Sequence, residues 1–177
     1  DCSRPCTGGA SILLASENTC KKFTDVPIWI TGIGQKTTSA GFTKNIAFSS
    51  MESTHLAAST AFKMSKCNVK DIDVAEVHDA FSVCEPMALE SIGFTDKGKG
   101  MDMITELHTT NNRKINPRGG LIGSGHPLGA TGIAQTIEIT QQLQSCANKR
   151  QVENAKIGLV HNMSAAATSS TVLVLER

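Results

Sequence analysis

The chain has 177 residues, of which 40% are hydrophobic, and this length allows one domain with a sizeable core. Seventeen Lys and Arg against sixteen Asp and Glu leave a net charge of +1, with six Phe, one Trp and no Tyr. A dedicated nucleic-acid-binding protein needs a basic surface and aromatic stacking platforms, so the composition argues against that class. No apolar run reaches the roughly 18 residues of a membrane-spanning helix, so we expect no membrane span.

The amino end and the cysteines bear on where the protein works. The chain starts with Asp1 and shows neither a basic segment nor an apolar signal segment there, so we expect it to be part of something longer. The six cysteines lack the paired spacing of a zinc site, and no metal is expected. A domain of this size needs no disulfides, so we expect free thiols and an intracellular location, with cytoplasm, mitochondrion and peroxisome not distinguished.

Strands and helices alternate along the first half of the chain. Short apolar runs predict strands at 10–15 and 28–33. The segment 34–50 has no clear period and is expected to be a loop. Apolar residues at helical spacing after Ser53 predict a helix of about three turns, and 74–77 reads as a short strand.

The second half continues the alternation. Helical spacing predicts a helix over 81–92, in which Pro86 marks either a kink or a late start. The polar segment 97–112 is expected to be a surface excursion. Five glycines, at positions 119, 120, 123, 125 and 129, then punctuate a loop that leads into a helix at 133–143.

Two apolar runs, 157–160 and 171–175, predict strands joined by a turn of small residues, which suggests an antiparallel edge. The order of elements predicts the α/β class, with a mixed five-stranded sheet and helices on both faces. No internal repeat is visible, so residues 1–177 are expected to form one domain.

The glycine-rich segment 116–132 is the densest candidate for chemistry. Glycines let the backbone approach a ligand, and Pro127 fixes the chain beside His126. An imidazole at a helix entrance can exchange a proton near pH 7. The alternative is a glycine-rich connection with an incidental surface histidine. A dinucleotide fingerprint is rejected because Leu128 occupies the place of its third glycine.

Two further segments are candidates. His78 and Asp79 follow a predicted strand, where residues of an α/β sheet face the ligand crevice. The alternative is that Asp79 caps a helix beside a core His78. The turn 161–167 consists largely of small residues, which expose backbone N–H groups suited to an oxyanion hole, but such residues also make an ordinary tight connection.

These motifs together resemble the C-terminal half of a thiolase, closest to the branch of sterol carrier protein thiolases and archaeal acetyl-CoA acetyltransferases. The resemblance runs in order over nearly the whole chain, and the G-H-P-x-G-A-T-G stretch is specific. The matching segments are residues 1–3 (D-C-S), 8–11 (G-G-A-S), 78–81 (H-D-A-F), 116–120 (N-P-R-G-G), 125–132 (G-H-P-L-G-A-T-G) and 161–162 (H-N).

The resemblance implies an enzyme of two similar halves that acts on coenzyme A thioesters by Claisen condensation or thiolytic cleavage. Acyl-CoA would be the substrate, with no bound cofactor, and the partners would be an N-terminal half and further copies in a homodimer or tetramer. In that family, His126 would help to generate the thiolate and then bind a thioester oxygen, while His78 would hold a water or donate to the enolate oxygen. Oxyanion-hole and loop positions would fall at Gly129, Asn162 and Ser164.

Three departures from the family pattern bear on activity. The nucleophilic cysteine belongs to the absent N-terminal half, so the isolated chain is expected to be inactive. The acid/base cysteine of this branch falls at Ala80, and the C-x-G of the last loop reads N-M-S at 162–164. Cys84, one helical turn after Ala80, is the nearby thiol, either as a replacement acid/base or as an inert buried cysteine. Residues 164–167 replace glycines and are expected to be less able to adopt positive φ.

Two other functions stay open. A thiolase-like retro-aldolase acting on coenzyme A thioesters would keep the fold without the cysteines. A degenerate, non-catalytic partner subunit would also account for their loss, although both motif histidines are present.

Overall fold

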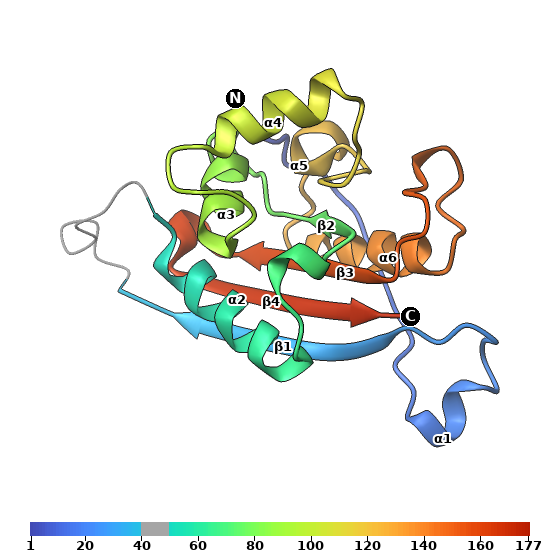
Figure 1. Ribbon diagram of the computed structural model, residues 1–177. Helices are drawn as coiled ribbons and strands as arrows, with labels where there is room; N and C mark the ends of the chain where they lie inside the picture. The colour runs from blue at the N-terminus through green and yellow to red at the C-terminus, as the bar shows by residue number, and fades with distance from the viewer. Residues whose placement is uncertain (40–49) are drawn as a thin grey trace.

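The computed structural model describes residues 1–39 and 50–177 and is built around one mixed sheet (Figure 1). The strand order is β1-β4-β3-β2. β2 runs parallel to β3, while β4 is antiparallel to both of its neighbours, β3 and β1. The strands are β1 (Trp29–Thr37), β2 (Val74–Glu76), β3 (Ile157–Met163) and β4 (Ser169–Glu176).

Helices cover both faces of this sheet. Leu159 packs in the core on the α2 and α3 side, whereas the next residue, Val160, packs with α6 on the other side. This alternation along β3 is the period of a strand buried on both faces. The helices are α1 (Glu17–Cys20), α2 (Glu52–Ser65), α3 (Cys84–Ile92), α4 (Gly100–Thr109), α5 (Gly120–Ser124) and α6 (Thr131–Leu143), and three single 3-10 turns cover Val69–Asp71, Asn148–Arg150 and Ala165–Ala167. The predicted α/β class with helices on both faces is confirmed.

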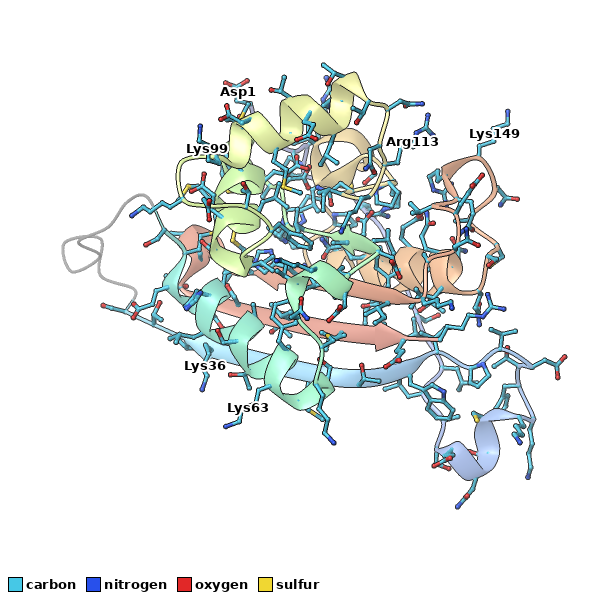
Figure 2. The ribbon with its side chains drawn as sticks, in the orientation of Figure 1. Asp1, Lys36, Lys63, Lys99, Arg113 and Lys149 are labelled. Carbon is cyan, nitrogen blue, oxygen red and sulfur yellow. The ribbon has the colours of Figure 1, made fainter. Side chains whose placement is uncertain are left out.

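Helix α2 packs closely against β1. A Cβ added at Gly34 would overlap the Ala57 carbonyl oxygen, and one at Gly32 would overlap that of Ala61. Small residues on both elements therefore bring the helix backbone against the strand. Long charged side chains such as those of Lys36 and Lys63 extend outward at this edge (Figure 2).

The prediction of a fifth strand at 10–15 is wrong. Within the described residues this segment has no strand partner, and Leu13 and Leu14 are 68% and 70% exposed. Apolar β-forming residues become a strand only where a neighbour supplies the hydrogen bonds of a ladder. The predicted loop at 34–50 begins later than expected because β1 continues to Thr37, and 40–49 lie outside the described residues.

Two other expectations need correction. The surface excursion at 97–112 contains helix α4, whose Met103, Ile104 and Leu107 pack against the core. The expected antiparallel edge is confirmed, but β1 forms it by pairing antiparallel with β4, and β4 itself lies inside the sheet. Helix α3 starts at Cys84, so Pro86 marks a late start, in the first turn where its missing N–H costs nothing. In the part of the chain that is described, no helix has the length and apolar character needed to cross a membrane.

Candidate functional site

Two of the predicted site residues, His78 and His126, meet in the structure. Their ring centroids are 5.0 Å apart and the rings are nearly perpendicular, at 85°. His78 follows the carboxyl end of β2, and His126 lies between α5 and α6. The fold therefore brings together imidazoles that are 48 positions apart (126 − 78) in the chain.

The first residues of the chain run between the two histidine loops. The Ser3 amide donates to the Ala80 carbonyl over 2.8 Å, and the His126 amide donates to the Arg4 carbonyl over 3.0 Å. This segment ties both loops to one strip of backbone, so it sets their separation.

Its neighbours hold the His126 ring in one orientation. Nδ1 of His126 lies 2.7 Å from the Thr131 hydroxyl, which donates its proton to the Pro127 carbonyl over 3.0 Å. Because that proton is committed, the hydroxyl accepts from Nδ1–H, and Nε2 keeps its lone pair. Burial lowers the pKa of His126, with the Asp79 charge acting weakly in the other direction. The neutral ring with a free Nε2 can accept a proton.

His78 is more deeply buried and is also neutral. It is 4% exposed, and its Nδ1 has no hydrogen-bond partner among the described residues. Burial, and then the neighbouring His126, lower the pKa of His78 to about 4. An unpaired ring nitrogen in a buried position costs free energy unless a water or ligand satisfies it.

The Asp79 carboxylate links the two histidine loops. Its Oδ1 accepts from the Leu121 amide over 2.6 Å, at the start of α5, and the Ile122 amide lies 3.4 Å from Oδ2. A Cβ at Gly120 would overlap the same carboxyl group, so glycine is required there. The alternative that Asp79 caps the helix that follows it is wrong, because its carboxylate accepts from the start of α5, 42 residues away, and α3 has no side-chain cap.

The third candidate segment forms a tight turn between β3 and β4. Ala166 and Ala167 have φ values of 56° and 51°. Both alanines adopt the positive φ that was expected to be harder for them than for glycine, and each stores about 1 kcal/mol of strain. The Ser164 hydroxyl accepts from the Ser169 amide over 2.9 Å and so closes the turn.

The other predicted residues have different surroundings. The Asn162 amide donates to Gln135 on α6 over 2.9 Å, while Gly129 is exposed with open space around it. Cys84 is buried at the start of α3, and burial raises the pKa of its thiol, which disfavours the reactive thiolate. Ala80 contributes its carbonyl oxygen to the contact with Ser3.

Two acidic residues near the site, the buried Glu76 and the half-buried Glu85, were not singled out from the sequence. Glu76 is fully buried, and its Oε2 has no partner among the described residues. Burial raises its pKa to about 8, although Arg118 acts in the opposite direction. Burial, and then the charge of Asp79, raise the pKa of Glu85 to about 7. The signal for Glu76 is a lone acidic residue within an otherwise apolar strand.

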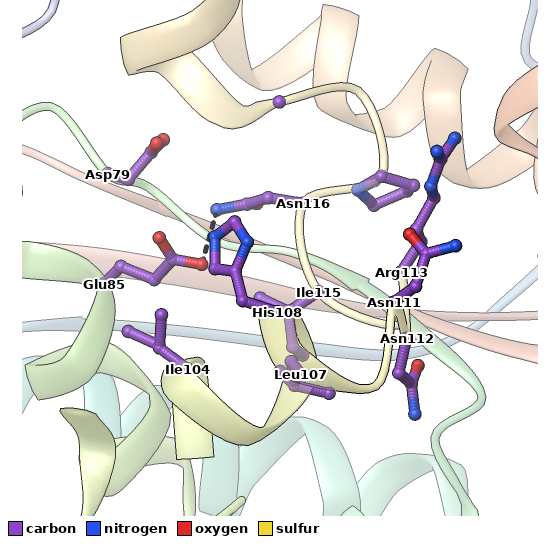
Figure 3. A pocket seen from close by; sticks show the side chains of 12 residues that line it. Asp79, Glu85, Ile104, Leu107, His108, Asn111, Asn112, Arg113, Ile115 and Asn116 are labelled. Atoms are coloured by element: carbon purple, nitrogen blue, oxygen red, sulfur yellow. Dashed lines mark hydrogen bonds between the residues drawn. The ribbon is translucent and has the colours of Figure 1, made fainter. Parts of the chain in front are cut away.

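Glu85 belongs to a polar cavity of about 420 Å³ beside α4. Its Oε1 accepts from the Asn116 amide over 3.3 Å, and the two side chains point toward one another (Figure 3). Asp79 and His108 also line this cavity, whereas His78 and His126 do not. The cavity is therefore separate from the histidine pair and shares Asp79 with its surroundings. Within residues 1–39 and 50–177, no group of three or more His, Cys, Asp or Glu residues could hold a metal ion.

A mixed sheet between two helical layers, with histidines delivered by a strand end and a glycine-rich loop, defines a thiolase-like α/β protein. The solved Ltp2-ChsH2(DUF35) aldolase shares this fold, with a TM-score of 0.76 over 90% of this chain and 42% of that chain. The two are 18% identical, so the likeness concerns the fold alone.

The family model described as thiolase C-terminal domain-like matches residues 34–177, and the chain belongs to this family. It is 38% identical to the acetyl-CoA acetyltransferase of Methanothermobacter thermautotrophicus, over all of this chain and 47% of that protein. It is 37% identical to sterol carrier protein 2 of Gallus gallus, over 92% of this chain and 31% of that protein. The chain thus spans less than half the length of these relatives, and the resemblance inferred from its motifs is confirmed.

Proposed function

We propose that the chain is the C-terminal half of a thiolase-type acyltransferase that acts on acyl-CoA thioesters by Claisen condensation or thiolytic cleavage. The observation that carries this proposal is the pair of neutral imidazoles at 5.0 Å, His78 and His126, delivered by two separate motif loops. The similarity to an acetyl-CoA acetyltransferase over the whole chain supports the same reaction class.

Each histidine has a role that suits its surroundings. The Thr131 hydroxyl fixes Nδ1–H of His126, so Nε2 can take the proton of a nucleophilic thiol that the N-terminal half supplies. His78 is neutral and buried, and it would bind the thioester or enolate oxygen directly or through a water. The loop positions Gly129, Asn162 and Ser164 would frame the second oxyanion site.

The proposal also names the partners. The substrate is an acyl-CoA, no cofactor is bound, and the nucleophile comes from an N-terminal thiolase half. Exposed Leu13 and Leu14 support association with further protein. The assembly would be an intracellular homodimer or tetramer.

Complementation tests the proposal. The chain is produced with and without the N-terminal half of a matching thiolase, and thiolysis of acetoacetyl-CoA is followed. Activity is expected only from the combination, and His126→Ala should reduce it by about 10²-fold or more. The matched control is His108→Ala, because His108 is exposed and lies in the separate cavity. Failure of every complementation, or equal effects of the two substitutions, would contradict the proposal.

A retro-aldolase is the second candidate, since Ala80 and 162–164 lack the cysteines of the thiolase branch. The structural neighbour is named an aldolase, which agrees with this candidate. Product analysis separates the two reactions, because retro-aldol cleavage consumes no free coenzyme A. A third candidate, a non-catalytic partner subunit, predicts no turnover with any N-terminal half and stable binding to an intact thiolase.

A further inference from the structure

A row of buried hydroxyl groups lies where the start of α2 meets β3 and β4. Ser53, Thr54 and His161 are fully buried, and Ser170 is 1% exposed. Their side chains lie between His78, which follows β2, and the turn that contains Ala167. The two ends of this row, His78 and Ala167, are far apart in the sequence.

Five hydrogen bonds link these groups without a gap. The His78 amide lies 3.4 Å from Nδ1 of His161, and Nε2 of His161 lies 3.0 Å from the Thr54 hydroxyl. Thr54 is 2.9 Å from the Ser170 hydroxyl, which is 2.7 Å from the Ser53 hydroxyl. Ser53 donates to the Ala167 carbonyl over 2.6 Å.

The two ends determine the direction of every proton in between. A carbonyl only accepts, so the Ser53 hydroxyl donates to Ala167 and must accept from Ser170. Ser170 in turn accepts from Thr54, and Thr54 accepts from Nε2–H of His161. Nδ1 is then left without a proton and accepts from the His78 amide. Burial lowers the pKa of His161 to about 3, in agreement with a neutral ring.

We infer that His161 is a positioning residue that, through this hydrogen-bond chain, holds the backbone at His78 and the turn Ala165–Ala167 in fixed relation. One ring nitrogen bonds the His78 amide, just after β2, and the other bonds the Thr54 hydroxyl on α2. The Ser53 hydroxyl holds the carbonyl of Ala167, a residue in the strained left-handed conformation. The inference assigns to the buried histidine no contact with substrate, and its meaning for catalysis rests on the proposed function.

The ring protonation of His161 is the first test. Long-range ¹H–¹⁵N correlation spectra of the histidine-labelled chain distinguish the two neutral forms of each imidazole. The expected result is a proton on Nε2 and none on Nδ1 for His161 at neutral pH. A proton on Nδ1, or a charged ring, overturns the inference.

Removing one hydroxyl in the middle of the chain is the second test. Thr54→Val keeps the shape of the side chain but removes the link to His161 and Ser170. Hydrogen exchange of the His78 amide is expected to accelerate roughly fivefold, the factor that loss of one ordinary hydrogen bond produces. The resonances of Ala166 and Ala167 should shift in the same variant, and Thr54→Ser should restore both signals.

The matched control is Thr60→Val, on the same helix. The Thr60 hydroxyl is exposed and bonds the Leu56 carbonyl over 2.9 Å, so its loss should leave His78 and Ala167 unchanged. Unaltered signals at both ends in Thr54→Val, or equal changes in Thr60→Val, contradict the inference. If Thr54→Val does not fold, the ring protonation of the unaltered chain decides. Neither readout uses turnover, so failure of this inference is distinct from failure of the proposed function.

Discussion

His126 and His78 lie side by side but are held in different ways. The ring of His126 is fixed by Thr131, five residues away in its own motif. The backbone of His78 bonds His161, 83 residues away, and through it depends on α2 and β4. The His126 ring is therefore fixed by a local segment, although its backbone amide bonds the distant Arg4, whereas the His78 backbone is held by the assembled fold. Changes around His126 should affect mainly the site, whereas changes around His78 should affect stability as well.

The largest expected effect separates the two positions directly. His161→Ala leaves a cavity and removes the acceptor of the buried His78 amide, and should lower the free energy of unfolding by about 3 kcal/mol. His126→Ala removes a partly exposed side chain and should change this free energy by about 0.5 kcal/mol or less. Urea denaturation of both variants measures the difference, and equal losses would remove the contrast between local and long-range positioning.

A pH-dependent effect is expected at Glu76, on the strand that leads to His78. Its pKa is raised to about 8 in the folded chain, so between about pH 4.5 and pH 8 the folded state holds a proton that the unfolded state has released. The free energy of unfolding contributed by Glu76 falls as pH rises through this range. The Glu76→Gln variant has no such titrating group, so its free energy of unfolding does not fall in this way. The difference in free energy of unfolding between the variant and the unaltered chain should therefore grow by about 2 kcal/mol as pH rises.

Denaturation at several pH values measures this gap for Glu76→Gln. The exposed Glu106 on α4 provides the control, because Glu106→Gln should change the free energy of unfolding only slightly. A gap for Glu76→Gln that stays constant from pH 5 to pH 8 would show that the carboxyl is not protonated in the folded chain.

A smaller effect is expected in the local region. Thr131→Val removes the acceptor for Nδ1–H of His126, and should cost about 1 kcal/mol of stability. The pKa of His126 should fall further, because the hydroxyl stabilises the charged ring more than the neutral one. An NMR titration measures this shift, and Thr131→Ser should retain the original value. A Val variant that titrates like the unaltered chain would show that Thr131 does not hold the ring.

The smallest effect is expected in the turn at the other end of the hydrogen-bond chain. Ala166 has φ 56°, which glycine adopts without strain. Ala166→Gly should therefore raise the free energy of unfolding by about 0.5 kcal/mol. The relief of strain exceeds the cost that the greater conformational freedom of glycine in the unfolded chain adds. Ala165→Gly, at an exposed neighbour without positive φ, should lower it by a similar amount. Thermal unfolding compares the pair, and a loss in both would argue against strain at Ala166.

The sequence predicts best what local patterns determine. The helix after Ser53 and the strands at 157–160 and 171–175 are confirmed because their apolar spacing matches the faces that they bury. The segment 10–15 has the same β-forming character, but a strand also needs a partner, and none of the described residues supplies one. Helix α4 was missed because three apolar residues at helical spacing are set in a polar, glycine-containing segment.

The site shows the same limit. His78 and His126 are recognisable because short motifs surround them, and their meeting in space follows from the resemblance to thiolases. The importance of Ser53 and Thr54 was not recognised, since these residues read as the start of a helix. Their hydrogen-bond partners lie 107 to 117 residues away, and no pattern of neighbouring residues indicates such a distant contact.

The direction of the bonds from His78 to Ala167 has one more consequence. A chain of hydroxyls that begins at a water or an acid can reverse all of its protons together and so conduct charge, but here one end is a backbone amide and the other a carbonyl. Only one ordering of protons satisfies both ends. The row of hydroxyls therefore has a structural role and cannot conduct protons. Any proton that leaves the histidine pair must travel by another route.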